Sequence, residues 1–411
     1  MFEKKNLANV DEAGDVNGVC RILLVNKYDL FRYRGAEVRW LNILKAWSQL
    51  RGNFRVDVLV PKHVKWERVK LNGEKVRVYR LKPCIPLLKR FTGVAPIDIL
   101  LLDLRLIKFI LKRPYDRVVL ASFPFPPFTL LMLFVLRKFF DRFKHVRMIV
   151  HIDHLPQTRP YPSVLMFFKA LFAVVFDLFT ILMTKITLLR GDVITTVSNY
   201  IGKKLRKMFR GREIHVTFNG VDVSVFKPMS GFERDNVVFS WGGLYPRKGF
   251  DLLIYAIALL RKKYREDVIC RIAGKGFFEK ELENIIRKLK LENVVVLLGE
   301  VSERELIKEI NKARVVVIPS LIEGFCLTIV EAMACRKPVI AWDLPPMNEI
   351  IVHNYNGFLV KPFDIERLAN YIRLLLHNKD FREKLASNAF KTALKYTWEK
   401  VAERQWEALG F

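Results

Sequence analysis

Two glutamates, Glu323 and Glu331, stand with seven residues between them around a short polar turn and the start of a helix. The apolar run Val315–Ile318 before the turn predicts a strand buried on both faces, as in a parallel sheet. Gly324 lets the backbone bend and come close to a ligand. The N–H groups at the start of the following helix attract anions. Because two carboxylates would repel a simple phosphate, we expect a ligand that carries both phosphates and hydroxyl groups, as a nucleotide sugar does.

The same stretch resembles the E-x7-E motif of the "group 1" retaining glycosyltransferases, which have the GT-B fold. This resemblance implies that Glu331 binds the ribose diol of the donor and that Glu323 binds hydroxyls of the donor sugar. A sugar-orienting role explains Glu323 as well as a covalent one does, so we assign it no covalent step. An ordinary strand-turn-helix with surface glutamates is the alternative interpretation of the motif alone. The donor phosphates are expected at the helix start, beside Gly324, Phe325, Cys326, Leu327 and Thr328.

The loop of residues 241–249 carries a second landmark. In the family this loop usually reads Gly-Arg-x4-Lys-Gly, and both cations hold the donor pyrophosphate. Lys248 aligns with the lysine, whereas Gly243 stands in place of the arginine. Arg247 offers a neighbouring cation in compensation. If it cannot compensate, donor affinity should be weak or the enzyme inactive. A later stretch resembles the family's acidic loop and makes Glu349 a further donor-side residue.

Two stretches of the first half resemble the acceptor side of the family. Residues 34–37 (Arg-Gly-Ala-Glu) resemble a Gly-Gly-x-Glu turn whose amides face the donor phosphates or the acceptor, with Arg34 replacing the first glycine and offering a cation instead. Residues 151–154 (His-Ile-Asp-His) end a strand where family members often carry a His-Asp pair near the transferred sugar. A lone histidine at a strand end is more often structural, but we favour His151 as catalytic, together with Glu323. The other acceptor-side candidates are Arg34, Gly35, Glu37, Asp153 and His154.

Apolar strands alternate with helical stretches along the whole chain, which predicts doubly wound parallel sheets. A chain of 411 residues is more than one core usually serves, so two domains are expected. The predicted fold class is therefore α/β, a GT-B arrangement of two Rossmann-like doubly wound domains facing a cleft. Its parts are a mobile tail at 1–18, an acceptor-binding domain at 19–213 completed by a C-terminal helix at 388–411, and a nucleotide-sugar-binding domain at 214–387. Residues 219–222 (Asn-Gly-Val-Asp) resemble the family's interdomain turn and receive a structural role.

Strands are expected at 21–26, 56–60, 76–81, 117–121, 146–152 and 193–197, and then at 237–241, 268–273, 294–298, 315–318 and 339–341. Helices are expected at 37–50, 97–112, 251–264, 279–290, 303–311, 365–377 and 381–409.

The net charge of +28 calls for an anionic partner, either nucleic acid or an anionic membrane surface. In segments 80–91, 104–113 and 136–144, basic residues alternate with leucine and phenylalanine. That pattern favours a surface that dips into lipid headgroups over one that reads bases, so we expect no nucleic-acid partner. Amphipathic helices with a solvated basic face are the alternative for each segment. Charges interrupt the apolar segment 164–189, so we expect a buried or membrane-contacting helix there, not a spanning one.

Five scattered cysteines without a C-x-x-C pair predict a reducing compartment, no disulfide framework and no structural zinc. The N-terminus lacks a basic-then-apolar signal pattern. We therefore expect a cytoplasmic protein, peripheral on the inner face of the membrane. Since the chain has no Asp-x-Asp pair in a metal-binding context, we expect transfer without a metal or another cofactor.

The predicted function is that of a retaining, hexosyltransferase-type enzyme of class EC 2.4. It would move a sugar from a nucleotide sugar to a hydroxyl of a lipid-linked or membrane-located acceptor. Two alternatives stay open from the sequence. One is another GT-B enzyme, such as a nucleotide-sugar epimerase or a phosphorylase. The other is a catalytically weak, polybasic GT-B protein that binds membranes or nucleic acid.

Overall fold

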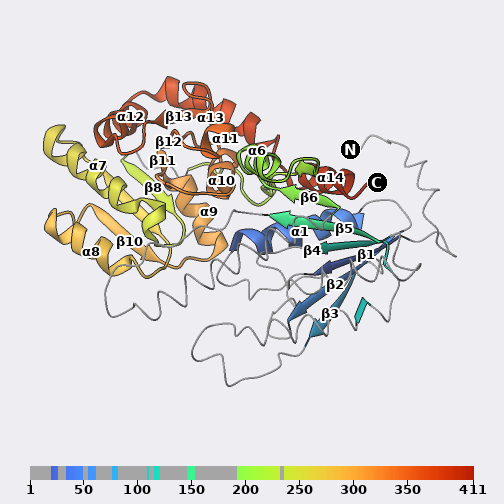
Figure 1. Cartoon of the computed structure of the whole chain (residues 1–411). Helices are drawn as coiled ribbons and strands as arrows, with labels where there is room; N and C mark the ends of the chain where they lie inside the picture. Colours follow the sequence, from blue (N-terminus) through green and yellow to red (C-terminus); the bar gives the residue numbers. More distant parts are fainter. Residues whose placement is uncertain are drawn as a thin grey trace, which may run out of the picture. The chain divides into compact units, whose positions relative to one another are not determined.

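The computed structural model describes residues 20–25, 34–49, 54–61, 76–81, 109–110, 115–120, 146–152, 192–231 and 236–411. These residues form two compact units (Figure 1). The first comprises the described residues of 1–197 with Ile201–Thr217 and Ala402–Phe411, and the second comprises Ser198–Tyr200 and Phe218–Val401. The borders expected from the sequence were 213/214 and 387/388. The expected tail at 1–18, the basic segment 136–144 and the apolar segment 164–189 lie outside the described residues.

The first unit contains a seven-stranded sheet in the order β3-β2-β1-β4-β5-β6-β7, with every neighbouring pair parallel. Its strands are β1 (Cys20–Val25), β2 (Phe54–Pro61), β3 (Val76–Leu81), β4 (Arg117–Leu120), β5 (Arg147–Ile152), β6 (Val193–Thr196) and β7 (Glu213–Val216). Helix α1 (Arg34–Gln49) follows β1, and helix α6 (Asn199–Met208) connects β6 to β7.

The C-terminal end of the chain packs on the first unit through α1. Trp40 and Trp47 of this helix are fully buried. The indole N–H of Trp47 donates to the carbonyl of Ala402 at 3.1 Å, and the buried guanidinium of Arg39 donates to Gln405 at 3.0 Å. Polar groups inside a core need such partners, because a buried donor without one is costly. These bonds fix the end of α14 (Trp398–Ala408) on the first unit.

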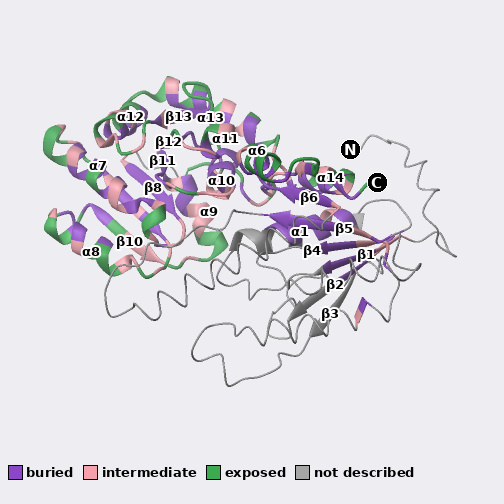
Figure 2. Cartoon of the chain, viewed as in Figure 1, coloured by how far each residue is buried: buried purple, intermediate pink, exposed green. Residues whose placement is uncertain are grey.

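The second unit contains a six-stranded parallel sheet in the order β10-β9-β8-β11-β12-β13. Its strands are β8 (Val237–Trp241), β9 (Ile269–Ala273), β10 (Val295–Gly299), β11 (Val315–Ile318), β12 (Val339–Trp342) and β13 (Gly357–Val360). Every residue of β8, β11 and β12 is buried, as expected for central strands with both faces covered (Figure 2). The second unit also contains the short 3-10 helix η4 (Pro246–Lys248) and helices α7 (Phe250–Lys263), α8 (Glu279–Lys288), α9 (Glu303–Lys312), α10 (Leu327–Ala334), α11 (Met347–Ile350), α12 (Ile365–His377) and α13 (Lys379–Ala393).

The two sheets confirm the predicted class of two doubly wound α/β domains, and some details differ from the sequence-based expectation. Strands β7 and β13 were not expected, and the single expected helix 381–409 is two helices, α13 and α14. Strand β7 alternates polar and apolar residues over four positions, and β13 begins with a glycine that resembles a turn. Both strands lie at the edge of their sheet, where burial imposes a weaker pattern on the sequence.

Candidate functional site

Strands β8 and β11 are neighbours at the centre of the second sheet, and the strand order reverses between them. Parallel α/β sheets bind ligands at such a switch point, beyond the carboxyl ends of the strands. The loops after β8 and β11 hold Lys248 and Glu323. They are joined by hydrogen bonds from the Leu321 amide to the Arg247 carbonyl at 2.8 Å and from the Arg247 guanidinium to the Ile322 carbonyl at 3.0 Å. The two predicted motifs, which are far apart in the sequence, therefore lie side by side in the folded second unit.

Gly249 allows these two loops to approach each other. Its φ of 65° lies in the left-handed region, and a Cβ atom there would lie 2.2 Å from the carbonyl oxygen of Pro319. Any side chain at this position would push the start of α7 away from the end of β11. Glycine is therefore required by both the backbone conformation and the space.

Lys248 and Glu323 form an ion pair at the switch point. Their side chains are only 12% and 11% exposed, and Arg247 lies 3.7 Å from the second carboxylate oxygen of Glu323. Burial acts to raise the pKa of Glu323, but the charges of Lys248 and Arg247 and hydrogen bonds from Lys248 and Ser320 hold that pKa below its ordinary value. Glu323 is therefore a carboxylate at neutral pH, and the predicted phosphate-binding lysine neutralises it.

The turn between Glu323 and α10 reaches the helix through an unusual backbone conformation. Cys326 precedes the helix with φ 76°, whereas Gly324 is not among the residues of positive φ. The bend expected at the glycine is thus made at the cysteine, at a cost of about 1–3 kcal/mol for a non-glycine residue. Burial raises the pKa of the Cys326 thiol to about 12, so the thiol is protonated and unreactive at neutral pH.

The remaining residues of this turn surround the start of α10. Phe325 is buried and its ring lies 5.5 Å from that of Tyr396, while Leu327 and Thr328 are half-buried. The first N–H groups of a helix have no partners within the helix. Leu327 and Thr328 thus form the positive end of α10, which follows Glu323 in this turn.

Glu331, on the second turn of α10, accepts a hydrogen bond from the indole of Trp241 at 3.1 Å. Trp241 ends β8, is 6% exposed and stacks on Phe239 at 5.3 Å. The predicted ribose-binding carboxylate is therefore oriented by Trp241, a residue that the motifs do not predict to be functional. One sequence signal could have indicated this role. It is a tryptophan that ends a predicted central strand and directly precedes the glycines of the phosphate loop.

Gly243, which stands where the family carries an arginine, lies so close to Tyr245 that a side chain here would displace the tyrosine ring. A Cβ atom at this position would lie 2.5 Å from the ring of Tyr245. Tyr245 in turn contacts Phe277 with ring centroids 5.3 Å apart. An aromatic side chain thus occupies the space beside Gly243, and Arg247 is the cation next to Lys248 and Glu323.

The structure gives Glu349 a capping contact. Its carboxylate accepts hydrogen bonds from the backbone amides of Asn199 at 2.8 Å and Tyr200 at 2.5 Å, and all three residues group with the second unit. A carboxylate at the first amides of a helix is stabilised by the helix dipole. Both oxygens of Glu349 are engaged there, and its predicted contact with the donor stays a prediction.

His151 has no exposed surface, and its catalytic role stays a prediction. Its Nδ1 lies 2.8 Å from the hydroxyl of Thr195, and its ring packs edge-on against Trp40 at 5.4 Å. The side chain of His151 thus packs in the core of the first unit. Asp153, His154 and the side chains of Arg34 and Glu37 lie outside the described set, and Gly35 is described only as part of the backbone of α1.

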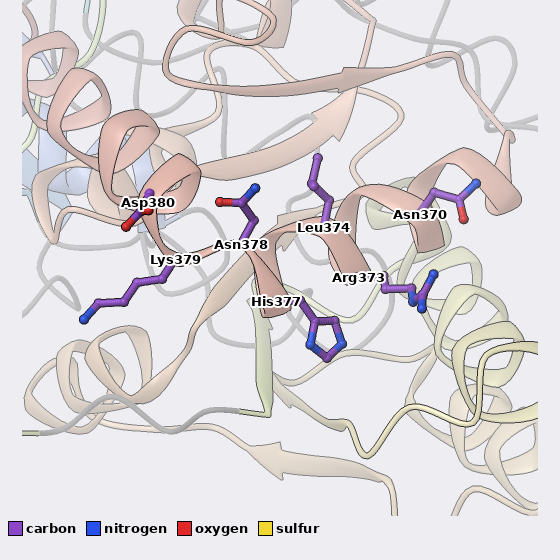
Figure 3. Close-up of a pocket in the computed structure, with 7 residues that line it drawn as sticks. All are labelled: Asn370, Arg373, Leu374, His377, Asn378, Lys379 and Asp380. Atoms are coloured by element: carbon purple, nitrogen blue, oxygen red, sulfur yellow. The ribbon is translucent and has the colours of Figure 1, made fainter.

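A surface pocket at the junction of α12 and α13 is separate from these residues (Figure 3). Arg373 and His377 on its wall bind Glu266 at 2.7 and 2.8 Å. Burial acts to raise the pKa of Glu266, and these two partners hold it below its ordinary value. Both side chains thus already have a partner in Glu266, and the pocket contains no predicted site residue. Its lining is Asn370, Arg373, Leu374, His377, Asn378, Lys379 and Asp380.

The described residues contain neither a metal-binding cluster nor a membrane-spanning helix. No three His, Cys, Asp or Glu side chains among these residues are grouped closely enough to hold a metal ion. Within these ranges, every helix is too short or too polar to traverse a bilayer.

Part of the chain resembles a known protein family. Residues 225–392 match the family model described as glycosyl transferases group 1. An uncharacterized glycosyltransferase of Methanocaldococcus jannaschii is 33% identical over 210 residues, which cover 51% of this chain and 57% of that protein. The chain spans about half the length of the curated relatives that it matches.

Two solved structures resemble nearly the whole chain. Sucrose-phosphate synthase from Thermosynechococcus elongatus gives a TM-score of 0.72 at 19% identity, covering 94% of this chain and 98% of that one. The HepE protein of Anabaena, solved in complex with UDP-glucose, gives 0.70 at 20% identity, covering 95% and 99%. At these identities the likeness shows the fold alone, which is GT-B.

Proposed function

We propose that this protein is a retaining glycosyltransferase, because residues 225–392 match the family model of glycosyl transferases group 1. It moves a sugar, in our proposal a hexose, from a nucleotide-sugar donor to a hydroxyl of a lipid-linked or membrane-located acceptor. The observation that carries the proposal is the meeting of Lys248, Glu323 and the start of α10 at the switch point of the second sheet. The donor class is supported by HepE, whose structure holds UDP-glucose.

In this proposal, the donor phosphates bind between Lys248 and the first amides of α10. Both groups are positive, so they stabilise the negative charge that collects on the nucleoside diphosphate as the glycosidic bond breaks. Arg247, 41% exposed and adjacent to Lys248, adds a second cation at the edge of the site. The proposal needs no metal ion for this stabilisation.

Glu323 and Glu331 hold hydroxyl groups in this proposal, Glu323 those of the sugar and Glu331 the ribose diol. Both are suited to that task because an ionised carboxylate accepts hydrogen bonds on two oxygens. Glu323 is ionised at neutral pH, and its partner Lys248 is the group that the donor phosphates would recruit. Donor binding thus exchanges one anionic partner of the lysine for another and leaves the glutamate available to the sugar.

The test is release of nucleoside diphosphate from a panel of nucleotide sugars, measured with the full chain with and without vesicles that carry a polyisoprenoid acceptor. We expect one donor to be consumed, with product in the anomeric configuration of the donor and with turnover unchanged by a metal chelator. Lys248→Met should lower turnover about 100-fold, the loss typical of removing one preorganised charge-stabilising group. Lys263→Met is the matched control, because Lys263 is half exposed and paired with Glu366 on the surface of the same unit.

Three results would contradict the proposal. The first is that no nucleotide sugar binds saturably or is consumed. The second is that Lys248→Met and Lys263→Met behave alike. The third is that the product has the inverted configuration, which would leave a glycosyltransferase but not a retaining one.

A further inference from the structure

Helix α6 carries a dense group of exposed cations, and none of them is a predicted site residue. We call this group the basic face; it consists of four residues of α6 and two in the turn that follows. Every one of them is exposed (Figure 2). The opposite side of the helix is apolar and buried, with Ile201 and Leu205 2% and 0% exposed. The residues of the basic face are Lys203, Lys204, Arg206, Lys207, Arg210 and Arg212.

Interactions inside the first unit account for only part of this charge. Arg206 donates to the carbonyl of Ile214 at 3.0 Å, and cations near the last turn of a helix are favoured by its dipole. Lys203, Lys207 and Arg210, however, make no ion pair with any described residue. Lys203 and Lys207 are also one turn apart, where like charges destabilise a helix.

The nearest acidic residue in sequence does not compensate for these cations. Glu213 already binds Arg147 at 2.8 Å and His215 at 2.6 Å. Its pKa is held below the ordinary value by the hydrogen bond from His215 and by Arg147, against the effect of burial. Lys203, Lys207 and Arg210 are therefore left without an acidic partner among the described residues.

We propose that the basic face binds an anionic phospholipid surface, and this inference rests on the membrane-located acceptor of the proposed function. The charge balance of the chain supports it. Residues 1–220 hold 40 Lys and Arg against 17 Asp and Glu, whereas residues 221–411 hold 30 against 25, so the first part carries +23 of the total +28. Juxtamembrane cations of this density are drawn to the negative potential of anionic lipids.

The chemistry of the helix favours lipid over nucleic acid. Proteins that hold single strands stack bases on exposed aromatic rings, and among the described residues 199–213 the two aromatic residues, Tyr200 and Phe209, are half-buried and buried. The exposed apolar side chain beside the cations is Met208, 52% exposed, which suits the headgroup region. Because the main apolar side of α6 packs on its own unit, the helix lies on the surface without inserting. Binding is therefore electrostatic and sensitive to salt.

The test is sedimentation of the full chain with vesicles of phosphatidylcholine alone or with 30% phosphatidylglycerol. Binding should require the anionic lipid and weaken steeply as salt is added. The variant Lys203→Gln/Lys207→Gln/Arg210→Gln removes three cations that make no ion pair with a described residue. It should bind about 100-fold more weakly, since one such cation near the membrane contributes about fivefold. The control Lys280→Gln/Lys288→Gln/Lys384→Gln removes the same charge from exposed positions of α8 and α13 and should bind like the wild type.

The outcomes separate this inference from the proposed function. The triple variant should still release nucleoside diphosphate from the soluble donor at the wild-type rate, which also shows that it folds. Equal vesicle binding by the triple variant and the wild type would overturn the inference. So would a basic face that binds an RNA oligonucleotide while ignoring anionic vesicles. Vesicle binding without donor turnover would instead refute the proposed function and leave the surface assignment standing.

Discussion

Replacing Lys248 by methionine should destabilise the second unit, because the substitution leaves the carboxylate of Glu323 without its main partner. Both side chains are almost buried, at 12% and 11% exposure. Removing one partner of a buried ion pair costs about 3–5 kcal/mol. Arg247, 3.7 Å from the other carboxylate oxygen, remains, so we expect the lower end of that range, about 3 kcal/mol at pH 7.

The same substitution should change how stability depends on pH. In the wild type, the pKa of Glu323 lies below its ordinary value of 4.5. The carboxylate therefore contributes stability that is present above pH 4.5 and is lost as the pH falls through the folded-state pKa. Without Lys248, burial dominates and raises the pKa, so protonation relieves the variant as the pH falls. The deficit of about 3 kcal/mol at pH 7 should shrink markedly by pH 4.

Native-state hydrogen exchange on peptides from β11 and α10 measures this deficit in the second unit by itself. The double variant Lys248→Met/Glu323→Gln should recover most of the lost stability, because it leaves no buried charge. Lys263→Met, at a half-exposed surface pair, should cost less than about 0.5 kcal/mol. The reasoning fails if Lys248→Met costs the same at pH 4 and pH 7, or if the double variant is as unstable as the single one.

Two further substitutions test the construction of the site. Trp241→Phe keeps an aromatic ring on the sheet but removes the N–H that orients Glu331, so donor affinity in a calorimetric titration should fall roughly tenfold or more while thermal stability changes little. Unchanged affinity, or an equal loss for ribose and 2′-deoxyribose donors, would contradict this positioning role. Gly249→Ala should cost about 3 kcal/mol in urea unfolding, because it adds overlap with the Pro319 carbonyl to an unfavourable φ. Gly299→Ala, with φ 66° and open space, should cost only about 1 kcal/mol, and equal losses would show that the overlap is unimportant.

The central strands could be predicted from the sequence because burial on both faces leaves a continuous apolar run. The expected bounds of β8 (Val237–Trp241) and β11 (Val315–Ile318) coincide with the observed ones. The edge strands β7 and β13 carry no such run, and their pairing depends on neighbours distant in sequence. The break between α13 and α14 could not be predicted either, because residues 394–397 contain no proline or glycine that would mark the end of a helix.

The site could be predicted only as two separate motifs. Lys248 and Glu323 were each assigned to a different part of the ligand, and nothing in either motif shows that they pair with one another across 75 positions. Likewise, the sequence does not reveal that Trp40 encloses His151 or that the carboxylate of Glu349 reaches the amide of Asn199. Each of these contacts joins elements that only the folded topology brings together. Motif spacing therefore predicts which residues form the candidate site but not which partners they contact.

The pairing of Lys248 with Glu323 bears on how the proposed donor would bind. The loops that carry the two side chains are tied by backbone hydrogen bonds through Arg247, so a change of partner at Lys248 does not require the loops to move. A pyrophosphate at the start of α10 would offer the lysine two negative charges where Glu323 offers one. The exchange then costs one ion pair and frees a carboxylate beside the sugar hydroxyls. Ordering the site before the donor arrives limits the conformational entropy lost on binding, and that is the advantage of a preformed pair at this position.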